Sequence, residues 1–369
     1  METLTFPSPH APPLPTLPFD LVADIFYRLP VKLLLQLRCL CKSFHSLISD
    51  SKFVKKHLQL SIKRPHLIVS STNNLGELLL IDFPMSSVFS TSTVMQTQLS
   101  YPITGKSVEY GLPMCLSSCD GILCFAINAN SVVLWNPSIR KFKLLPRLES
   151  PSEINTIFLY SFGYDRFIDN YKIISISFCV NDQIDVSVNT MGTNFWRRIH
   201  GFPYCNKICG SGVFASDTVN WLAYDASSTS LHAIVSLDLE KESYQKLSIP
   251  DLKKDNCTLG VIRDCLYIFE CNDMFLDVWM MKEYGNNESW TKLYNVRCMK
   301  DQVFYSYTKA LYISEDDQFL INFYDLRSKK LKLAIYDSKN CIWKNPGTHN
   351  VKSSSNVEVY IESLISPCS

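Results

Sequence analysis

The sequence has no stretch of 18 consecutive apolar residues, the length at which a segment becomes a candidate transmembrane helix. Its first residues also lack the basic region of a signal peptide and are interrupted by five prolines. We therefore expect no membrane span and an intracellular location, in the cytoplasm, the nucleus or both. The proline-rich residues 1–14 are expected to form a disordered, partly extended tail.

Glycine is scarce, with 12 residues in 369. The run GKS at 105–107 resembles the end of a phosphate-binding loop, but Ser100 stands where that loop requires its first glycine. The run GSG at 210–212 lacks the third glycine of a dinucleotide-binding turn. These departures argue against a nucleotide cofactor.

Histidine is also scarce, with seven residues. They are scattered along the sequence, and no two form a His-x-x-x-His pair. The 14 cysteines include groups at 115–124 and 205–209, but neither group has a second set at the spacing of a zinc site. We expect no metal, no other cofactor and no catalysis by this chain. Most cysteines are expected to be reduced and buried as small apolar side chains.

What the sequence does contain is a run of apolar residues at helical spacing between residues 15 and 58. Pro18 suits a helix start, and Pro30 ends the first apolar stripe. Residues 31–36 can form a short second helix, and a further stripe begins at Leu37. Asp50 is expected to cap a last helical turn. The two stripes are formed by Leu21, Val22, Ile25, Phe26 and Leu29, and by Leu37, Leu40, Cys41, Phe44, Leu47 and Ile48.

These three short helical patterns carry more apolar side chains than so small a unit can bury within itself. Two interpretations remain open: a bundle that packs its stripes internally, or a module that docks onto a partner. Residues 17–64 contain nine basic and three acidic residues, a net charge of +6, whereas the whole chain is only +1. This charge favours an acidic partner. Nucleic acid is not expected, because no reading helix or base-stacking motif accompanies the basic residues.

The run from Leu17 to Leu58 resembles an F-box, most closely that of the large plant group of F-box proteins. Phe44 stands where the family usually has Trp, and Leu33 where it often has Ser. The resemblance implies docking onto a Skp-type adaptor and, through it, onto the cullin and RING subunits of a ubiquitin ligase. The residues expected to contact the adaptor are Leu17, Pro18, Leu21, Ile25, Phe26, Leu29, Pro30, Leu34 and Leu37, with Cys41 and Phe44 in support.

Beyond residue 60, short runs of β-branched and aromatic residues alternate with turn residues every 8–12 positions, as is typical of all-β domains. Two series repeat there. An aromatic residue follows a polar turn at intervals of 46–54 residues, and an acidic turn separates two apolar runs at intervals of 47–52. The members are Phe142, Trp196, Tyr244, Trp290 and Trp343 in the first series, and Asp120, Asp169, Asp217, Asp264 and Asp316 in the second.

A unit of about 49 residues, with four short strands, is therefore repeated five times. This period predicts a kelch-like β-propeller, with an aromatic residue filling the space between neighbouring sheets. Residues 66–83 look like part of one further unit, and residues 357–366 alternate as a strand that can close the ring against it. We predict an α+β multidomain chain with a three-helix F-box at 15–60 and an all-β propeller of about six blades at 61–369.

Three phrases within this region, LWNPSIRKFKLLP, FGYDRFIDNYKII and VYIESLISP, resemble the F-box-associated domain of plant F-box proteins, in which WNP, GYD and a terminal ESL recur. Ile139 replaces the usual Thr, and the Gly-Gly pairs of true kelch repeats are absent. The resemblance implies a substrate-recognition subunit of a Skp–cullin–F-box ubiquitin ligase, whose propeller binds a target protein.

Two other functions remain open, a scaffold that binds the adaptor without ligase output and a propeller enzyme with a helical cap. The sequence does not identify the target. The loops expected to bind it at one rim of the ring are 85–113, 150–157, 200–211 and 225–231.

Overall fold

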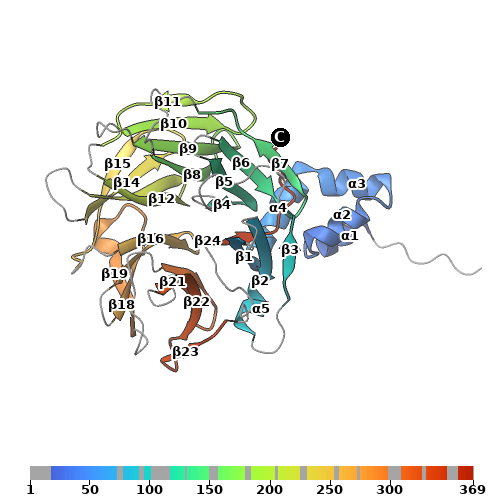
Figure 1. Cartoon of the computed structure of the whole chain (residues 1–369). Coiled ribbons are helices and arrows are strands. Elements are labelled where there is room, and N and C mark those ends of the chain that lie inside the picture. The colour runs from blue at the N-terminus through green and yellow to red at the C-terminus, as the bar shows by residue number, and fades with distance from the viewer. Residues whose placement is uncertain are drawn as a thin grey trace, which may run out of the picture.

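The computed structural model describes residues 18–368 apart from a set of internal segments. Figure 1 shows a group of helices beside a ring of β-sheets, so the predicted order of a helical region and then a six-bladed propeller is confirmed. The predicted tail at 1–14 lies outside the described residues. The internal segments that the structure does not describe are 73–77, 91–94, 101–116, 129–130, 149–156, 179–183, 204–206, 225–230, 253–256, 272–274, 298–308, 326–329 and 347–355.

The described part of the N-terminal region contains four helices, where the sequence predicts three. Pro18 and Pro30 occupy the N-cap positions of the first two, where a missing N–H breaks no helical hydrogen bond. Asp50 is an N-cap as predicted, since its Oδ1 accepts hydrogen bonds from the backbone N–H groups of Lys52 at 2.9 Å and Phe53 at 3.1 Å. The helices are α1 (Phe19–Phe26), α2 (Val31–Leu37), α3 (Lys42–Ser49) and α4 (Ser51–Ser61).

The apolar stripe that begins at Leu37 is not a continuous helix. A turn at residues 38–40 separates α2 from α3, and Cys41 caps α3 through an Sγ atom that lies 3.5 Å from the backbone nitrogen of Phe44. Apolar residues on both sides of the turn keep intervals of three and four, so the spacing alone could not reveal the break. One consequence is that Leu40 lies exposed in the turn.

The propeller consists of six antiparallel sheets of four strands, here called blades 1–6. Blade 1 contains β24 (Asn356–Ile361), β1 (Pro65–Thr72), β2 (Leu78–Pro84) and β3 (Thr97–Leu99). Blade 2 contains β4 (Ser117–Cys119), β5 (Ile122–Asn128), β6 (Ser131–Asn136) and β7 (Lys141–Leu144). Blade 3 contains β8 (Ile157–Asp165), β9 (Asn170–Phe178), β10 (Ile184–Thr190) and β11 (Arg197–Ile199).

Blade 4 contains β12 (Lys207–Ala215), β13 (Thr218–Tyr224), β14 (Leu231–Asp238) and β15 (Tyr244–Ser248). Blade 5 contains β16 (Cys257–Ile262), β17 (Cys265–Cys271), β18 (Phe275–Met281) and β19 (Trp290–Arg297), with the 3₁₀ turn η1 (Asn287–Ser289). Blade 6 contains β20 (Lys309–Ile313), β21 (Gln318–Asp325), β22 (Lys330–Asp337) and β23 (Ile342–Lys344). The short helix α5 (Met85–Phe89) follows β2.

The first strand of each blade forms the inner wall of the ring, because β24, β4, β8, β12, β16 and β20 each contact the next in a closed circle. The C-terminal strand β24 supplies the inner strand of blade 1 and pairs with β1 from Pro65↔Ile361 to Ser70↔Asn356. The predicted closure of the ring by the end of the chain is therefore confirmed. Val357 and Tyr360 of β24 are three residues apart, so they lie on opposite faces of the strand, and they are buried in two different cores.

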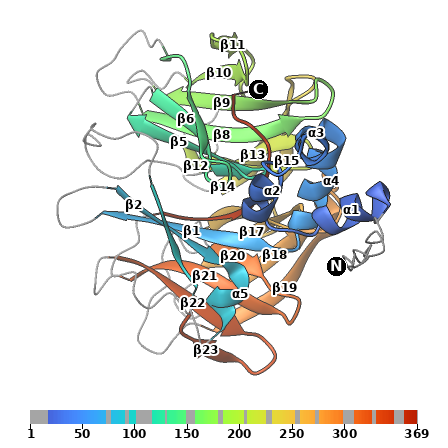
Figure 2. The same ribbon diagram turned by 90° about the vertical axis from the view of Figure 1, so that its right-hand side faces the viewer.

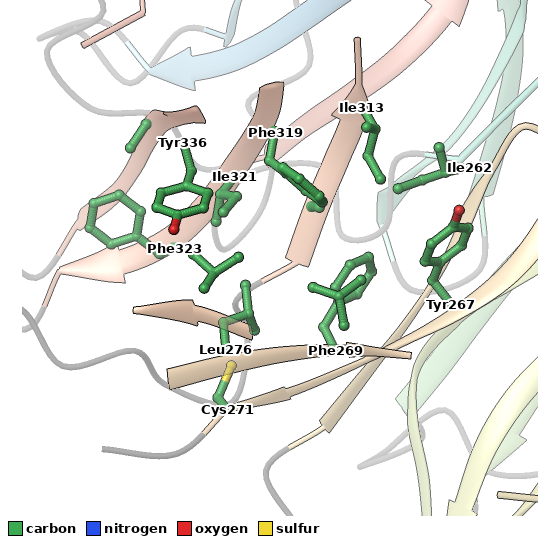
Figure 3. Close-up of a cluster of buried hydrophobic side chains, with 14 residues drawn as sticks. Ile262, Tyr267, Phe269, Cys271, Leu276, Ile313, Phe319, Ile321, Phe323 and Tyr336 are labelled. Carbon is green, nitrogen blue, oxygen red and sulfur yellow. The ribbon is translucent and has the colours of Figure 1, made fainter. Parts of the chain in front are cut away.

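Large apolar side chains fill the space between neighbouring blades. Figure 3 shows this packing between blades 5 and 6, where the side chains of β17 and β18 face those of β20, β21 and β22. A single four-stranded sheet cannot cover both its faces, so each blade depends on its neighbours for burial. The labelled residues are Ile262, Tyr267, Phe269, Cys271, Leu276, Ile313, Phe319, Ile321, Phe323 and Tyr336.

The aromatic series predicted to fill the space between sheets does so in four of its five members. The indole N–H groups of Trp196, Trp290 and Trp343 donate to backbone oxygens of the preceding blade, at 2.8, 2.9 and 3.0 Å. Tyr244 packs against Phe202, with ring centroids 5.2 Å apart. Phe142 is the exception, because it is 42% exposed on the outer strand of blade 2.

The acidic series marks the turn between the first and second strands of blades 2–6. Asp120, Asp169, Asp217 and Asp264 have positive φ angles of 48° to 62°, a region that aspartate tolerates better than most residues. In blade 6 Asp316 lies in this turn as predicted, and the residue with the positive φ, of 59°, is its neighbour Asp317.

Strand direction assigns the end of each described strand to one of two faces of the ring. First and third strands end at the face where the inner strands end, and second and fourth strands end at the opposite face. We call the first the helix face, because β1 begins there directly after α4. Figure 2 shows α1–α4 gathered on this side of the ring.

Candidate docking surface

The four N-terminal helices share a small core of their own. Phe26, Leu34, Ile48 and Phe53 are buried in it, and the ring of Phe26 meets that of Phe44 edge to face at 4.9 Å. The bundle interpretation is therefore correct for one side of the helices. The stripe of α1 does not point entirely into this core, however, and the rest of its apolar residues face outward.

An exposed apolar surface remains on α1, α2 and the turn after α2. Leu21 and Ile25, four residues apart on one face of α1, are 49% and 47% exposed. Phe19, Leu33 and Leu40 are exposed as well. We call these five exposed residues together the apolar docking surface, with Leu21 and Ile25 on one side of α1 and Phe19 on another.

The residues predicted to contact an adaptor divide into three groups in the structure, with Leu17 outside the described residues. Pro18, Leu21, Ile25, Pro30 and Cys41 are exposed, while Leu29, Leu37 and Phe44 are partly buried against the helical core. Phe26 and Leu34 are buried in that core, at 6% and 0% exposure. Their predicted direct contact with an adaptor is therefore corrected, since a buried side chain supports the surface from below.

Sequence reasoning missed Phe19 and Leu40 as surface residues and treated Leu33 only as a departure from the family pattern. Leu33 lies off the buried face of α2, so helix phase was the available signal for it. Phe19 is the first residue of α1 and shares the face of the buried Phe26, seven residues later, so helix phase could not reveal its exposure. Leu40 required knowledge of the break between α2 and α3.

His57 links α4 to the turn between α1 and α2. It is buried, and its Nε2 lies 2.9 Å from the backbone oxygen of Leu29, to which it donates. The Oγ of Ser61 lies 3.4 Å from its Nδ1. Burial is the main reason that the pKa of His57 is lowered, and the neutral ring is thereby favoured. His57 therefore packs within the helices and positions the turn that carries Pro30.

Positive charge remains available around the apolar docking surface. Lys56 lies 3.8 Å from Asp24 and 4.4 Å from the ring of Tyr27, so its charge is partly used within the helices. Lys32, Lys42 and Lys52 are exposed and make no ion pair with any residue that the structure describes. The predicted preference for an acidic partner is thus compatible with the geometry.

The described residues show no metal site and no membrane-spanning helix. They contain no group of three or more His, Cys, Asp or Glu side chains that could hold a metal ion. No helix among them is long and apolar enough to cross a bilayer. Of the ten described cysteines, four are buried and four are exposed, so the expectation that most are buried is wrong for this part of the chain.

The loops predicted to bind a target do not share one rim. Residues 85–90, which include α5, follow a third strand and lie at the helix face. The connections at 150–157 and 200–211 precede first strands, and 225–231 follows a second strand, so their flanking strand ends lie at the opposite face. Residues 91–94, 101–113, 150–156, 204–206 and 225–230 of these loops lie outside the described residues. The strand directions, which the sequence does not reveal, were needed to assign these loops to different faces.

The chain thus combines a six-bladed ring with a small helical module that exposes apolar and basic side chains. Residues 14–56 match the F-box domain family, and residues 74–367 match the family of the F-box associated beta propeller domain. The chain belongs to this family of F-box proteins, as the sequence predicted.

Its relatives include plant F-box proteins of similar length. The chain is 28% identical to the F-box/kelch-repeat protein At3g23880 of Arabidopsis thaliana, over 98% of this chain and 97% of the relative. It is 27% identical to the F-box protein CPR1 of the same plant, over 96% of this chain and 89% of the relative. The similarity thus covers both the helices and the whole ring.

Proposed function

We propose that this chain is the substrate-recognition subunit of a Skp–cullin–F-box ubiquitin ligase. An F-box joined to a propeller supports the general role of a substrate adaptor. In the specific proposal, the helices dock a Skp-type adaptor, which brings the cullin and RING subunits, and the propeller holds a target protein. The chain itself then contributes proximity and orientation to ubiquitin transfer, and no chemistry of its own.

The observation that carries this proposal is the apolar docking surface on the helices. Leu21 and Ile25 form its centre on α1, and burying each would contribute about 1.5–3 kcal/mol. A few central side chains usually dominate such interfaces. We propose that Pro18, Pro30, Phe19, Leu33 and Leu40 surround them, with Cys41 and Leu17 nearby, and that Phe26, Leu29, Leu34, Leu37 and Phe44 support them from the core.

The double variant Leu21→Asp with Ile25→Asp tests the docking surface. Two carboxylates in the middle of an apolar interface should reduce binding of a purified Skp-type adaptor by at least about 100-fold, since each is left without a partner. Isothermal titration with the full-length chain measures this loss. The ring should stay folded, which near-ultraviolet circular dichroism of its aromatic residues would report.

Ile342→Asp provides the matched control, because Ile342 on β23 is 48% exposed and lies on the far outer strand of blade 6. This variant should bind the adaptor as the unaltered chain does. Equal affinity of the double variant and the control would contradict the proposed docking surface.

We further propose that the target binds at the face opposite the helices. The helix face is partly covered by α1–α4, and the connections there between first and second strands are short, as at residues 120–121 and 263–264. β3 ends at Leu99 and β4 begins at Ser117, both at the opposite face, and 17 residues of the sequence join them. Longer loops on a rigid scaffold commonly carry binding.

Affinity purification with the proteasome blocked tests ligase assembly. The unaltered chain should capture the adaptor, the cullin and ubiquitinated proteins, whereas the Leu21/Ile25 double variant should lose the first two. Capture of the adaptor without a cullin would instead favour the alternative of a binding scaffold that has no ligase output.

A further inference from the structure

Three short sequence phrases that are far apart in the chain lie together at the helix face. WNP at 135–137 ends β6, GYD at 163–165 ends β8, and ESL at 362–364 directly follows β24. The C-terminal segment 362–367 connects them, and it continues past the end of the strand that closes the ring. In Figures 1 and 2 the red C-terminal ribbon runs close to the blue helices.

Asn136 of WNP holds this segment on blade 2. Its side chain is fully buried, and its Nδ2 donates to the backbone oxygens of Ser363 at 3.0 Å and Ile365 at 2.8 Å, with the Oγ of Ser363 also at 3.0 Å. Its Oδ1 accepts from the backbone N–H of Ser138 at 2.9 Å. Every polar atom of this buried amide is used, so the segment has one well-defined position on the blade.

The turn at Gly121 fits closely under the same segment. Gly121 has φ 80°, and a Cβ atom there would lie 2.5 Å from the backbone oxygen of Ile361 and 2.6 Å from the Oγ of Ser363. Only a residue without a side chain permits this approach and this backbone conformation. Two neighbouring turns of blade 2, at Asn136 and at Gly121, therefore contact the segment.

Successive side chains of the segment enter two different cores. Leu364 packs against the core of the N-terminal helices, which contains Phe26, Leu34, Ile48 and Phe53. Ile365 packs against the core between blades 2 and 3. The segment thus lies between the helices and the ring and is joined to both by apolar contact.

The remaining contacts between helices and ring are weaker. Lys55 on α4 lies 2.6 Å from Asp169, which also accepts a hydrogen bond from Tyr164 of GYD. Both partners of the ion pair are more than half exposed, and exposed pairs contribute little. The link from α4 to β1 consists of three residues, in which the guanidinium of Arg64 donates to the backbone oxygen of Arg28 at 2.8 Å.

We propose that the C-terminal segment 362–367 fixes the orientation of the N-terminal helices on the propeller, and that Leu364 is the positioning residue. Connected domains move relative to one another unless an apolar contact prevents it, and Leu364 supplies that contact. The importance of the orientation rests on the proposed function, because an adaptor docked on the helices would then face a bound target at a constant angle and distance.

Distance measurement by pulsed electron spin resonance on the full-length chain tests this proposal. Spin labels on unnatural amino acids at Ser46 of α3 and Lys246 of β15, both exposed, leave the native cysteines unaltered. The unaltered chain should give one narrow distance distribution. Leu364→Ala should give a clearly broader one, Leu364→Met should restore the narrow one, and the control Leu293→Ala on β19 should leave it unchanged.

Asn136→Ala approaches the same segment from the ring and removes hydrogen bonds to Ser363 and Ile365 without altering a residue that packs on the helices. Asn136→Ala should also broaden the distance distribution. If Leu364→Ala loses the helical circular dichroism signal, Asn136→Ala alone tests the proposal. Unaltered narrow distributions in Leu364→Ala and Asn136→Ala would overturn the proposal. No adaptor is present in this experiment, so its result is independent of the Leu21/Ile25 binding test.

Discussion

At the scale of single residues, three polar side chains join the strands that close the ring. His66 of β1 lies with its Nδ1 3.0 Å from Asp82 of β2, and the hydroxyl of Tyr360 on β24 donates to the same carboxylate oxygen at 3.0 Å. Burial acts to lower the pKa of His66, but the hydrogen bond and charge of Asp82, aided by Glu362, outweigh burial and the opposing charge of Arg64. The pKa of His66 is therefore raised.

This raised pKa predicts a pH-dependent contribution to stability. The contribution is fully present below the unfolded pKa of about 6.5 and is lost as the pH rises through the higher folded pKa, because the protonated ring is the form that Asp82 favours. Urea unfolding of the unaltered chain and of His66→Gln measures it. The difference in unfolding free energy between them should be larger at pH 5.5 than at pH 9, and a constant difference would contradict the assignment.

At the scale of elements, the repeated aromatic residue of the outer strands links one blade to the preceding one in blades 3–6. Trp196 donates to the backbone oxygen of Pro146 and packs against the core between blades 2 and 3, whereas Phe142 at the equivalent position is exposed. An aromatic residue at this position therefore contributes to packing between blades at Trp196 but is left exposed at Phe142.

Two substitutions compare these positions. Trp196→Phe should lower the free energy of unfolding by about 1–2 kcal/mol, since it removes a hydrogen bond and part of the packing. Phe142→Leu should change it by less than about 0.5 kcal/mol, as expected for an exposed side chain. Denaturant midpoints report both values, and a larger loss for Phe142→Leu would show that the series does not act through contact between blades.

Element boundaries show where sequence reasoning failed. The strands and their turns followed from alternating apolar residues and aspartates, which encode local geometry. The break between α2 and α3 at residues 38–40 did not follow. Apolar residues on both sides of the break keep helical intervals, so one continuous helix and two shorter helices fit the same residue pattern.

At the scale of the whole molecule, closure of the ring depends on the last strand. Removing residues 356–369 would leave β1 with an open edge and would take Val357 and Tyr360 out of the core. Since a domain is stable by only about 5–15 kcal/mol, this loss should leave little stability. The truncated chain should lack a cooperative thermal transition and should be cleaved rapidly by protease.

Deletion of residues 1–14 is the control for this truncation, since these residues precede every described element. It should leave the thermal midpoint unaltered. A cooperative transition at the original temperature in the chain without residues 356–369 would contradict the role of β24.

The amino-acid sequence was sufficient to predict the order of helices and propeller, the approximate number of blades and the stripe that contains Leu21 and Ile25. Each of these follows from residue spacing, which encodes the face of an element on which a side chain lies. Folding then covered Phe26 and Leu34 and left Leu40 exposed. It also brought Asn136 against Ser363, 227 residues away, because spacing does not specify which distant segment covers a face once the ring has closed.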